Sequence, residues 1–281
     1  MATGKRRALL VAAGLLVAAW EGIATAQEVA QIEAAPGTLV RWSAPGTKSC
    51  GMGRQSWPAL QETCYYPIDL LQPAGPIRIV RRGAGRPELA RIMVVATDYG
   101  TEEVELPDIP QANPSRADLQ RNAREQLRLG RLWRTSGPAR FTLPLGAPAQ
   151  PFPEGHAFGA KRIFNGKPAD QPHTGADYPL PLGTAVLSAA DGRVVLADDL
   201  FFAGNAVLID HGDGLITMYF HLSDFEVSAG QEVKKGERIG HVGSTGRATG
   251  PHLFFGARWH NARIDPALLI GDPAKLPAVA P

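Results

Sequence analysis

The histidine and aspartate residues in the second half of the chain have the types and spacing of a metal-dependent hydrolase. His173 and Asp177 stand four residues apart, and Gly175 between them would let the backbone bend so that both side chains converge. Neutral imidazole and carboxylate are standard donors for zinc. His221 and His252 follow later, and histidines beyond a ligand set can shuttle protons because their pKa lies near working pH. A zinc ion held there would polarise a peptide carbonyl and acidify a bound water.

Short strands separated by glycine turns are the elements that must position these side chains. His221 ends one apolar run, and His252 leads from a turn-rich stretch into another, residues 253–259. Further apolar runs lie at 185–188, 193–196, 206–210 and 215–220. Regular glycine turns between apolar strands indicate an antiparallel β architecture without a long helix.

Five sequence blocks occur in a fixed order around these residues. They are RIFNG at 162–166, HTGAD at 173–177, GNAVLIDHG at 204–212, YFHL at 219–222, and GSTG at 243–246 through PHL at 251–253. In identity and order these blocks resemble the M23 (LytM/lysostaphin-type) family of zinc metallopeptidases, in the exported form of Gram-negative bacteria. A lone HxxxD would be weak support, whereas five ordered blocks are strong.

The resemblance implies a fold, a cofactor and roles for four residues. The family domain is an antiparallel, lipoyl-like β-roll, expected here over residues 150–281, so the chain should be mainly β. By position, His173 and Asp177 would be zinc ligands, and His221 and His252 would activate water and stabilise the oxyanion. The expected partners are the cross-link peptides of peptidoglycan.

One position departs from the family pattern. The third zinc ligand is expected two residues after His252, where this chain has Phe254, which has no lone pair to offer a metal. Because a catalytic zinc keeps three protein ligands plus water, zinc binding should be weakened. His241 and His260 lie nearby in sequence, but neither has the i+2 spacing that would place a donor on the same strand face as His252.

Two functions from different classes therefore stay open. One is an M23-type metalloendopeptidase with an impaired zinc site, and the other is an inactive domain that binds peptidoglycan or regulates a cell-wall amidase. A third idea comes from residues 227–243, which resemble the hairpin of lipoyl- and biotinyl-carrier domains. Those domains flank the modifiable lysine with Asp or Met, whereas Lys234 and Lys235 stand beside Gly236 without that flank. A carrier function is therefore disfavoured.

The first 26 residues have the layout of a secretory signal. Three basic residues at 5–7 precede an apolar run at 8–20 and a small-x-small site at 24–26. The apolar run is shorter than the ~20 residues of a spanning helix, which disfavours a membrane anchor. The pair Arg6-Arg7 only weakly suggests twin-arginine export. We expect cleavage after Ala26, export to a Gram-negative periplasm, and no stable membrane span afterwards.

Charge and cysteine content limit which partners and which compartment suit the mature part. The leader has a net charge of +2, equal to that of the whole chain, so the mature part is close to neutral. Nucleic acid is a poor partner for such a chain, because it would require a strongly basic face. Cys50 and Cys64 are the only cysteines, and export makes a disulfide between them the simplest expectation. Closing that loop would contribute about 3 kcal/mol.

Two further parts are expected before the peptidase-like domain. Residues 27–108 should form a small β-rich domain, because their Val-, Ile- and Thr-rich segments alternate with glycine turns. Residues 109–149 should be a linker with one helix, which starts at Ser115 and has Asp118 three residues later. The arginines of that helix could contact an anionic polymer, although such runs are more often a solvated helix surface.

Overall fold

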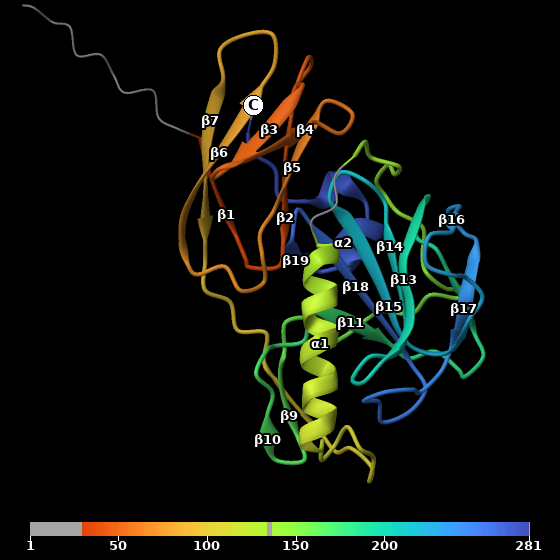
Figure 1. The fold of residues 1–281 in the computed structure, drawn as a ribbon. Coiled ribbons are helices and arrows are strands. Elements are labelled where there is room, and N and C mark those ends of the chain that lie inside the picture. Colours follow the sequence, from red (N-terminus) through yellow and green to blue (C-terminus); the bar gives the residue numbers. More distant parts are fainter. Residues whose placement is uncertain (1–29, 134–136, 281) are drawn as a thin grey trace, which may run out of the picture.

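The chain is mainly β in the computed structural model, which describes residues 30–133 and 137–280 (Figure 1). Two β-rich parts and a connecting helix are present, and most strand pairs are antiparallel, which confirms the predicted fold class. The expected secretory signal at 1–26 lies outside the described residues. Within the described residues, no helix combines the length and apolar content needed to span a bilayer.

The N-terminal part contains a five-stranded sheet and a two-stranded ribbon. The sheet has the order β1-β7-β6-β3-β4, and the ribbon pairs β2 with β5. The strands are β1 Ala30–Ala34, β2 Leu39–Ser43, β3 Ser49–Met52, β4 Gln55–Pro58, β5 Thr63–Pro67, β6 Gly75–Arg82 and β7 Glu88–Val94. Cys50 on β3 and Cys64 on β5 form the predicted disulfide. Both cysteines are fully buried, so the bridge fastens the ribbon to the sheet inside the core.

The connecting segment contributes one strand and one helix. Strand β8 (Thr101–Val104) pairs in parallel with β9 (Lys161–Phe164), and β10 (Lys167–Pro168) completes this small sheet. Helix α1 (Arg116–Leu132) is capped by Ser115, whose hydroxyl accepts from the Asp118 N–H while the Asp118 carboxylate accepts from the Ser115 N–H. This capping box is the helix start that the sequence predicted.

The C-terminal part is a sheet of nine strands in residues 137–280. Its main path has the order β11-β18-β15-β14-β13-β16, with β12, β17 and β19 attached at the sides. The elements are β11 Gly175–Tyr178, β12 Ala185–Leu187, β13 Gly192–Leu200, β14 Gly204–Asp210, β15 Leu215–Phe225, β16 Glu232–Val233, β17 Arg238–Val242, β18 Leu253–Trp259, β19 Ala262–Ile264, α2 Ala267–Ile270 and the 3-10 helix Pro273–Lys275. The regular glycine turns thus produce the expected antiparallel sheet with only short helices.

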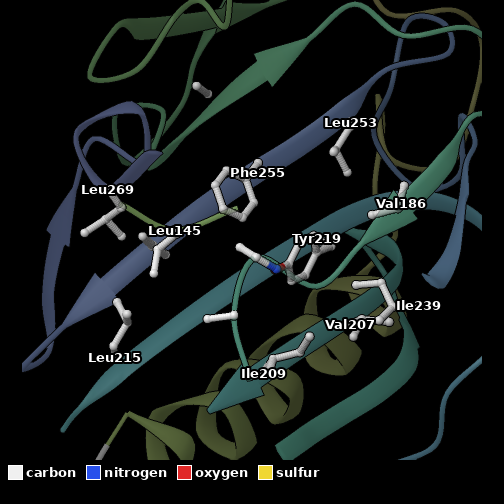
Figure 2. Close-up of a cluster of buried hydrophobic side chains, with 14 of the residues drawn as sticks. Leu145, Val186, Val207, Ile209, Leu215, Tyr219, Ile239, Leu253, Phe255 and Leu269 are labelled. Carbon is white, nitrogen blue, oxygen red and sulfur yellow. The ribbon is translucent and has the colours of Figure 1, made fainter. Parts of the chain in front are cut away.

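The two faces of β15 and β18 have different roles, because successive side chains of a strand point to opposite sides. Tyr219 and Phe255 point into the main core, where Figure 2 shows them among aliphatic side chains. Phe220 and Phe254 belong to the other face, whose cluster includes Leu129 of helix α1. The second face is the one that carries the candidate site.

Candidate active site

The candidate site lies across three neighbouring strands, β11, β18 and β15. In the pairing of β11 with β18, Asp177 stands directly opposite Phe254, and in the pairing of β15 with β18, Phe220 stands opposite Phe254. Paired residues share a face of the sheet, so these three side chains form one row. His221 follows Phe220 on β15, and His252 directly precedes β18. The sheet register therefore gathers residues far apart in the sequence.

The structure brings all four predicted residues together. His173 Nε2 lies 3.3 Å from Asp177 Oδ1, and His252 Nε2 lies 3.7 Å from the same oxygen. The rings of His221 and His252 have centroids 4.7 Å apart. His173, Asp177 and His221 are buried, whereas His252 is partly exposed. The four side chains thus form one cluster that solvent reaches from the side of His252.

Backbone carbonyls fix the orientation of the three imidazoles. His173 Nδ1 faces the carbonyl of Ala157 at 3.2 Å, and His221 Nδ1 faces that of Thr245 at 2.8 Å. His252 Nδ1 faces its own loop at the Gly250 carbonyl, 2.9 Å away. A carbonyl only accepts hydrogen bonds, so each Nδ1 carries a proton, and Nε2 is the nitrogen whose lone pair a neutral ring would present. This is the tautomer that a metal ligand or a general base requires.

Asp177 is ionised and incompletely hydrogen-bonded. Burial alone would raise the pKa of this carboxyl, but His173 and the Arg162 guanidinium outweigh burial and hold the pKa well below its usual range. Arg162 Nη2 lies 2.6 Å from Asp177 Oδ2. The other oxygen, Oδ1, is buried and has no hydrogen-bond partner among the described residues. That free oxygen is the one directed at His173 and His252.

His221 differs from an ordinary surface histidine in charge and backbone. Burial, and next the neighbouring His252, lower the pKa of His221 to about 3, so the ring is neutral at neutral pH. Its backbone has φ +64°, a left-handed conformation that costs a non-glycine residue roughly 1–2 kcal/mol. The His221 N–H donates to the Ala203 carbonyl at 2.9 Å, which helps to hold this conformation. Strain of this kind is concentrated at functional sites.

Comparison with known proteins agrees with this geometry. Residues 171–266 match the model of peptidase family M23. The chain carries an M23 peptidase domain. A crystal structure described as a peptidase M23 of Pseudomonas aeruginosa is similar, with a TM-score of 0.63 and 29% identity over 84% of this chain and 95% of that one.

Two curated bacterial proteins resemble the M23 domain in sequence. Peptidoglycan DD-endopeptidase ShyA of Vibrio cholerae is 49% identical over 84 residues, which are 30% of this chain and 20% of ShyA. DD-carboxypeptidase/endopeptidase Mpg of Neisseria meningitidis serogroup B is 48% identical over 94 residues, which are 34% of this chain and 22% of Mpg. The chain thus covers about a fifth of the length of these relatives.

Phe254 fills the position opposite Asp177 in the M23 domain. Its ring stacks on Phe220, with centroids 4.7 Å apart and planes 7° from parallel, and meets His173 edge-on at 5.2 Å. A side-chain carbon at Gly175 would collide with the ring. Gly175 begins strand β11, so its small size gives Phe254 room, whereas the sequence had suggested that it would bend the backbone.

The donors present do not fit a catalytic zinc with three protein ligands. The described residues contain no group of three or more His, Cys, Asp or Glu side chains that could hold a metal. His173 Nε2 and Asp177 Oδ1 are separated as two donors of one tetrahedral zinc would be, roughly 3.4 Å. The third direction, however, is filled by the hydrocarbon ring of Phe254. The site is therefore one ligand short.

Neither of the two nearby histidines supplies the missing ligand. His241 Nδ1 lies 2.9 Å from the Asp224 carboxylate. The His260 ring packs on Trp57 of the N-terminal part at 4.3 Å. Both side chains are thus engaged elsewhere, as their sequence spacing suggested.

A cavity of about 180 Å³ opens beside Asp177 and His252. Sequence reasoning gave no role to three charged residues that line it, Glu102, Arg162 and Arg247. Arg162 opens the first of the five sequence blocks, which was a usable signal, and Arg247 lies in the turn before His252. Glu102 lies on β8 and reaches the site because β8 pairs with β9. No pattern in the sequence predicted that β8 pairs with β9.

Proposed function

We propose that this chain is an exported, peptidoglycan-directed M23-type metalloendopeptidase with an impaired zinc site. In this proposal His173 and Asp177 are the metal ligands, and His221 and His252 are the acid–base pair. The observation that carries it is the convergence of the His173 and His252 Nε2 atoms on the free Asp177 oxygen, with the His221 ring 4.7 Å from that of His252. The substrate class, cross-link peptides of the wall, is supported by the names of the relatives ShyA and Mpg.

The same proposal assigns roles to the rest of the chain. Residues 1–26 are the export signal, which places the mature protein in the periplasm. Residues 27–108 are a β-rich module that packs against the peptidase domain, and residues 109–149 are the linker. Residues 150–281 are the peptidase domain that carries the site. An extracytoplasmic location agrees with the buried Cys50–Cys64 disulfide, because such bonds persist in oxidising compartments.

The impairment follows from the ligand count. A catalytic zinc keeps three protein ligands and one water, and removal even of groups that only orient the ligands lowers metal affinity about 10- to 100-fold. Loss of a ligand itself should cost at least the upper end of that range. We therefore expect zinc to bind weakly, and wall hydrolysis to be slow unless zinc is in excess.

The proposal is tested by hydrolysis of purified peptidoglycan sacculi. The mature wild-type chain in excess zinc is expected to release soluble peptides slowly, and chelator should stop the release. His173→Ala and His252→Ala are expected to abolish it, while Lys234→Ala, an exposed residue outside the site, is a control that should keep it. Hydrolysis that survives both active-site changes would overturn the proposal.

A second candidate is a non-catalytic M23 domain that binds peptidoglycan or regulates a cell-wall amidase. Phe254 favours it, and so does Arg162, whose cation already compensates the charge of Asp177. The sacculus assay separates the two candidates. Binding to sacculi without peptide release at any zinc concentration would support the non-catalytic form and overturn the enzyme.

A further inference from the structure

Arg247 is held between two aromatic rings at the edge of the site. Its guanidinium carbon lies 3.9 Å from the ring centroid of Phe164 and 4.5 Å from that of Phe202. Its backbone N–H donates to the Phe202 carbonyl at 2.8 Å. Cation–π contact with two faces fixes the plane of the guanidinium and leaves its N–H edge for other partners. The side chain is thus immobilised before any ligand arrives.

The charge of Arg247 has no carboxylate partner in the part of the chain that the structure describes. Arg162, its neighbour, is 2.9 Å from Glu102 and 2.6 Å from Asp177. Arg263 is likewise paired, with Asp69 at 3.0 Å. Burial, and next the charge of Arg162, lower the pKa of Arg247 to about 10, so it remains a cation at neutral pH. Partly buried cations are usually paired, and this one is not.

The cavity beside the active-site cluster is where a partner would lie. Arg247, Phe164, Asp177 and His252 all line that cavity of about 180 Å³. A planar guanidinium fork matches a carboxylate with two parallel hydrogen bonds. The four charged side chains that line the cavity, Glu102, Asp177, Arg162 and Arg247, cancel one another, which suits a singly charged carboxylate better than a doubly charged phosphate.

We propose that Arg247 anchors a carboxylate of the bound peptide, and so makes the site selective for peptides with a free carboxylate near the segment that faces His252. This inference rests on the proposed function, in which the cavity receives wall peptides. It adds a specificity-determining residue outside the four of the active-site cluster. The aromatic sandwich keeps the fork oriented while Arg162 stays committed to Glu102 and Asp177.

The anchor is tested with two matched synthetic peptides. One is a peptidoglycan stem peptide with free carboxylates, and the other is the same peptide with its carboxylates amidated. Titration calorimetry on the mature wild-type chain should show the acid form binding at least about tenfold tighter, as expected for a charge-assisted, bidentate contact. Arg247→Gln should remove this preference while leaving the affinity for the amide form unchanged. Arg247→Lys should retain part of it, because it keeps the charge but loses the fork.

Arg258→Gln is the matched control. Arg258 also stacks on an aromatic ring, with its guanidinium carbon 4.4 Å from the centroid of Trp133, but it does not line the cavity. This variant should keep the full acid preference. Thermal unfolding of each variant checks folding, and if Arg247→Gln fails to fold, the partial loss in Arg247→Lys decides the question.

Three outcomes would overturn the anchor: equal affinity for the two peptides in the wild type, failure of both to bind, or an acid preference that survives Arg247→Gln. The proposed function fails separately, in the sacculus assay. Sacculus binding or hydrolysis without acid preference would remove the anchor alone, whereas acid preference without any action on sacculi would remove the proposed wall substrate alone.

Discussion

His211 precedes strand β15 and His221 lies within it, and the surroundings of their rings differ. His211 is fully buried, with Nδ1 2.8 Å from the Asp191 carbonyl and Nε2 2.7 Å from the Thr217 hydroxyl. His221 Nδ1 is hydrogen-bonded to the Thr245 carbonyl, and the rest of the ring faces His252. Both histidines fall in blocks that resemble the M23 family. The comparison teaches that hydrogen bonding of the second nitrogen separates a structural histidine from one available for chemistry.

Phe254→His should have the largest effect of the variants. It changes zinc binding at the site that contains His221 and leaves the surroundings of His211 unchanged. The new imidazole would stand opposite Asp177 and complete the ligand set, so zinc affinity should rise by at least about 100-fold. Competition titration with a chromogenic chelator measures it. Phe220→His is the matched control, since Phe220 stacks on Phe254 but does not pair with the Asp177 strand. An equal gain in both variants, or a gain in neither, would mean that Phe254 is not the missing ligand position.

Alanine at the two histidines should separate stability from activity. His211→Ala removes two buried hydrogen bonds and leaves a cavity, so unfolding free energy should fall by roughly 3 kcal/mol. His221→Ala loses one hydrogen bond and should cost roughly 1 kcal/mol, yet it should abolish peptide release from sacculi. Urea unfolding and the sacculus assay measure the two quantities. Equal destabilisation by both changes would mean that His211 and His221 do not differ in their structural roles.

The free energy of unfolding should depend on pH through the titration of His211. Burial lowers the pKa of His211 to about 4 in the folded chain, against an unfolded value near 6.5. A histidine with a depressed pKa is stabilising above pH 6.5, and this contribution is lost as the pH falls toward 4. Between those two pH values the wild type should lose roughly 3 kcal/mol more than His211→Gln does. Parallel urea melts at pH 7 and pH 4.5 test this, and identical pH profiles would count against a buried neutral His211.

Glycine substitution should give the smallest effect, with opposite sign at the two sites. His221 has φ +64°, so His221→Gly should be about 1 kcal/mol more stable than His221→Ala. His211 is not among the described residues with positive φ, and there glycine should be less stable than alanine by roughly 0.5–1 kcal/mol. Thermal melts of the four variants supply the comparison. The same sign at both positions would show that backbone strain at His221 is not released.

Local sequence signals predicted much of the fold and the membership of the site. The alternation of apolar strands and glycine turns indicated the antiparallel sheet, and the Ser115–Asp118 spacing indicated the helix start. The ordered blocks named the residues that meet around Asp177. These features depend on residues close in sequence or on recognisable motifs, so they can be read without a structure.

Other features depend on contacts that no local pattern encodes. Strand β8 has ordinary strand composition, and nothing in it predicts pairing with β9, yet that pairing brings Glu102 to Arg162. The tautomers of the site histidines are set by backbone carbonyls, and every residue type supplies a carbonyl. The aromatic sandwich around Arg247 joins three separate segments. Such tertiary contacts become visible only when the register of the whole sheet is known.

Zinc stoichiometry shows whether Phe254 deprives the M23 domain of its third zinc ligand. The mature wild-type chain and Phe254→His would be equilibrated with equimolar zinc, desalted, and measured by atomic emission, with His173→Ala as the background. We expect well under one zinc per wild-type chain and close to one per Phe254→His chain. One zinc per wild-type chain that disappears in His173→Ala would contradict this expectation, because the site would then hold its metal without that ligand.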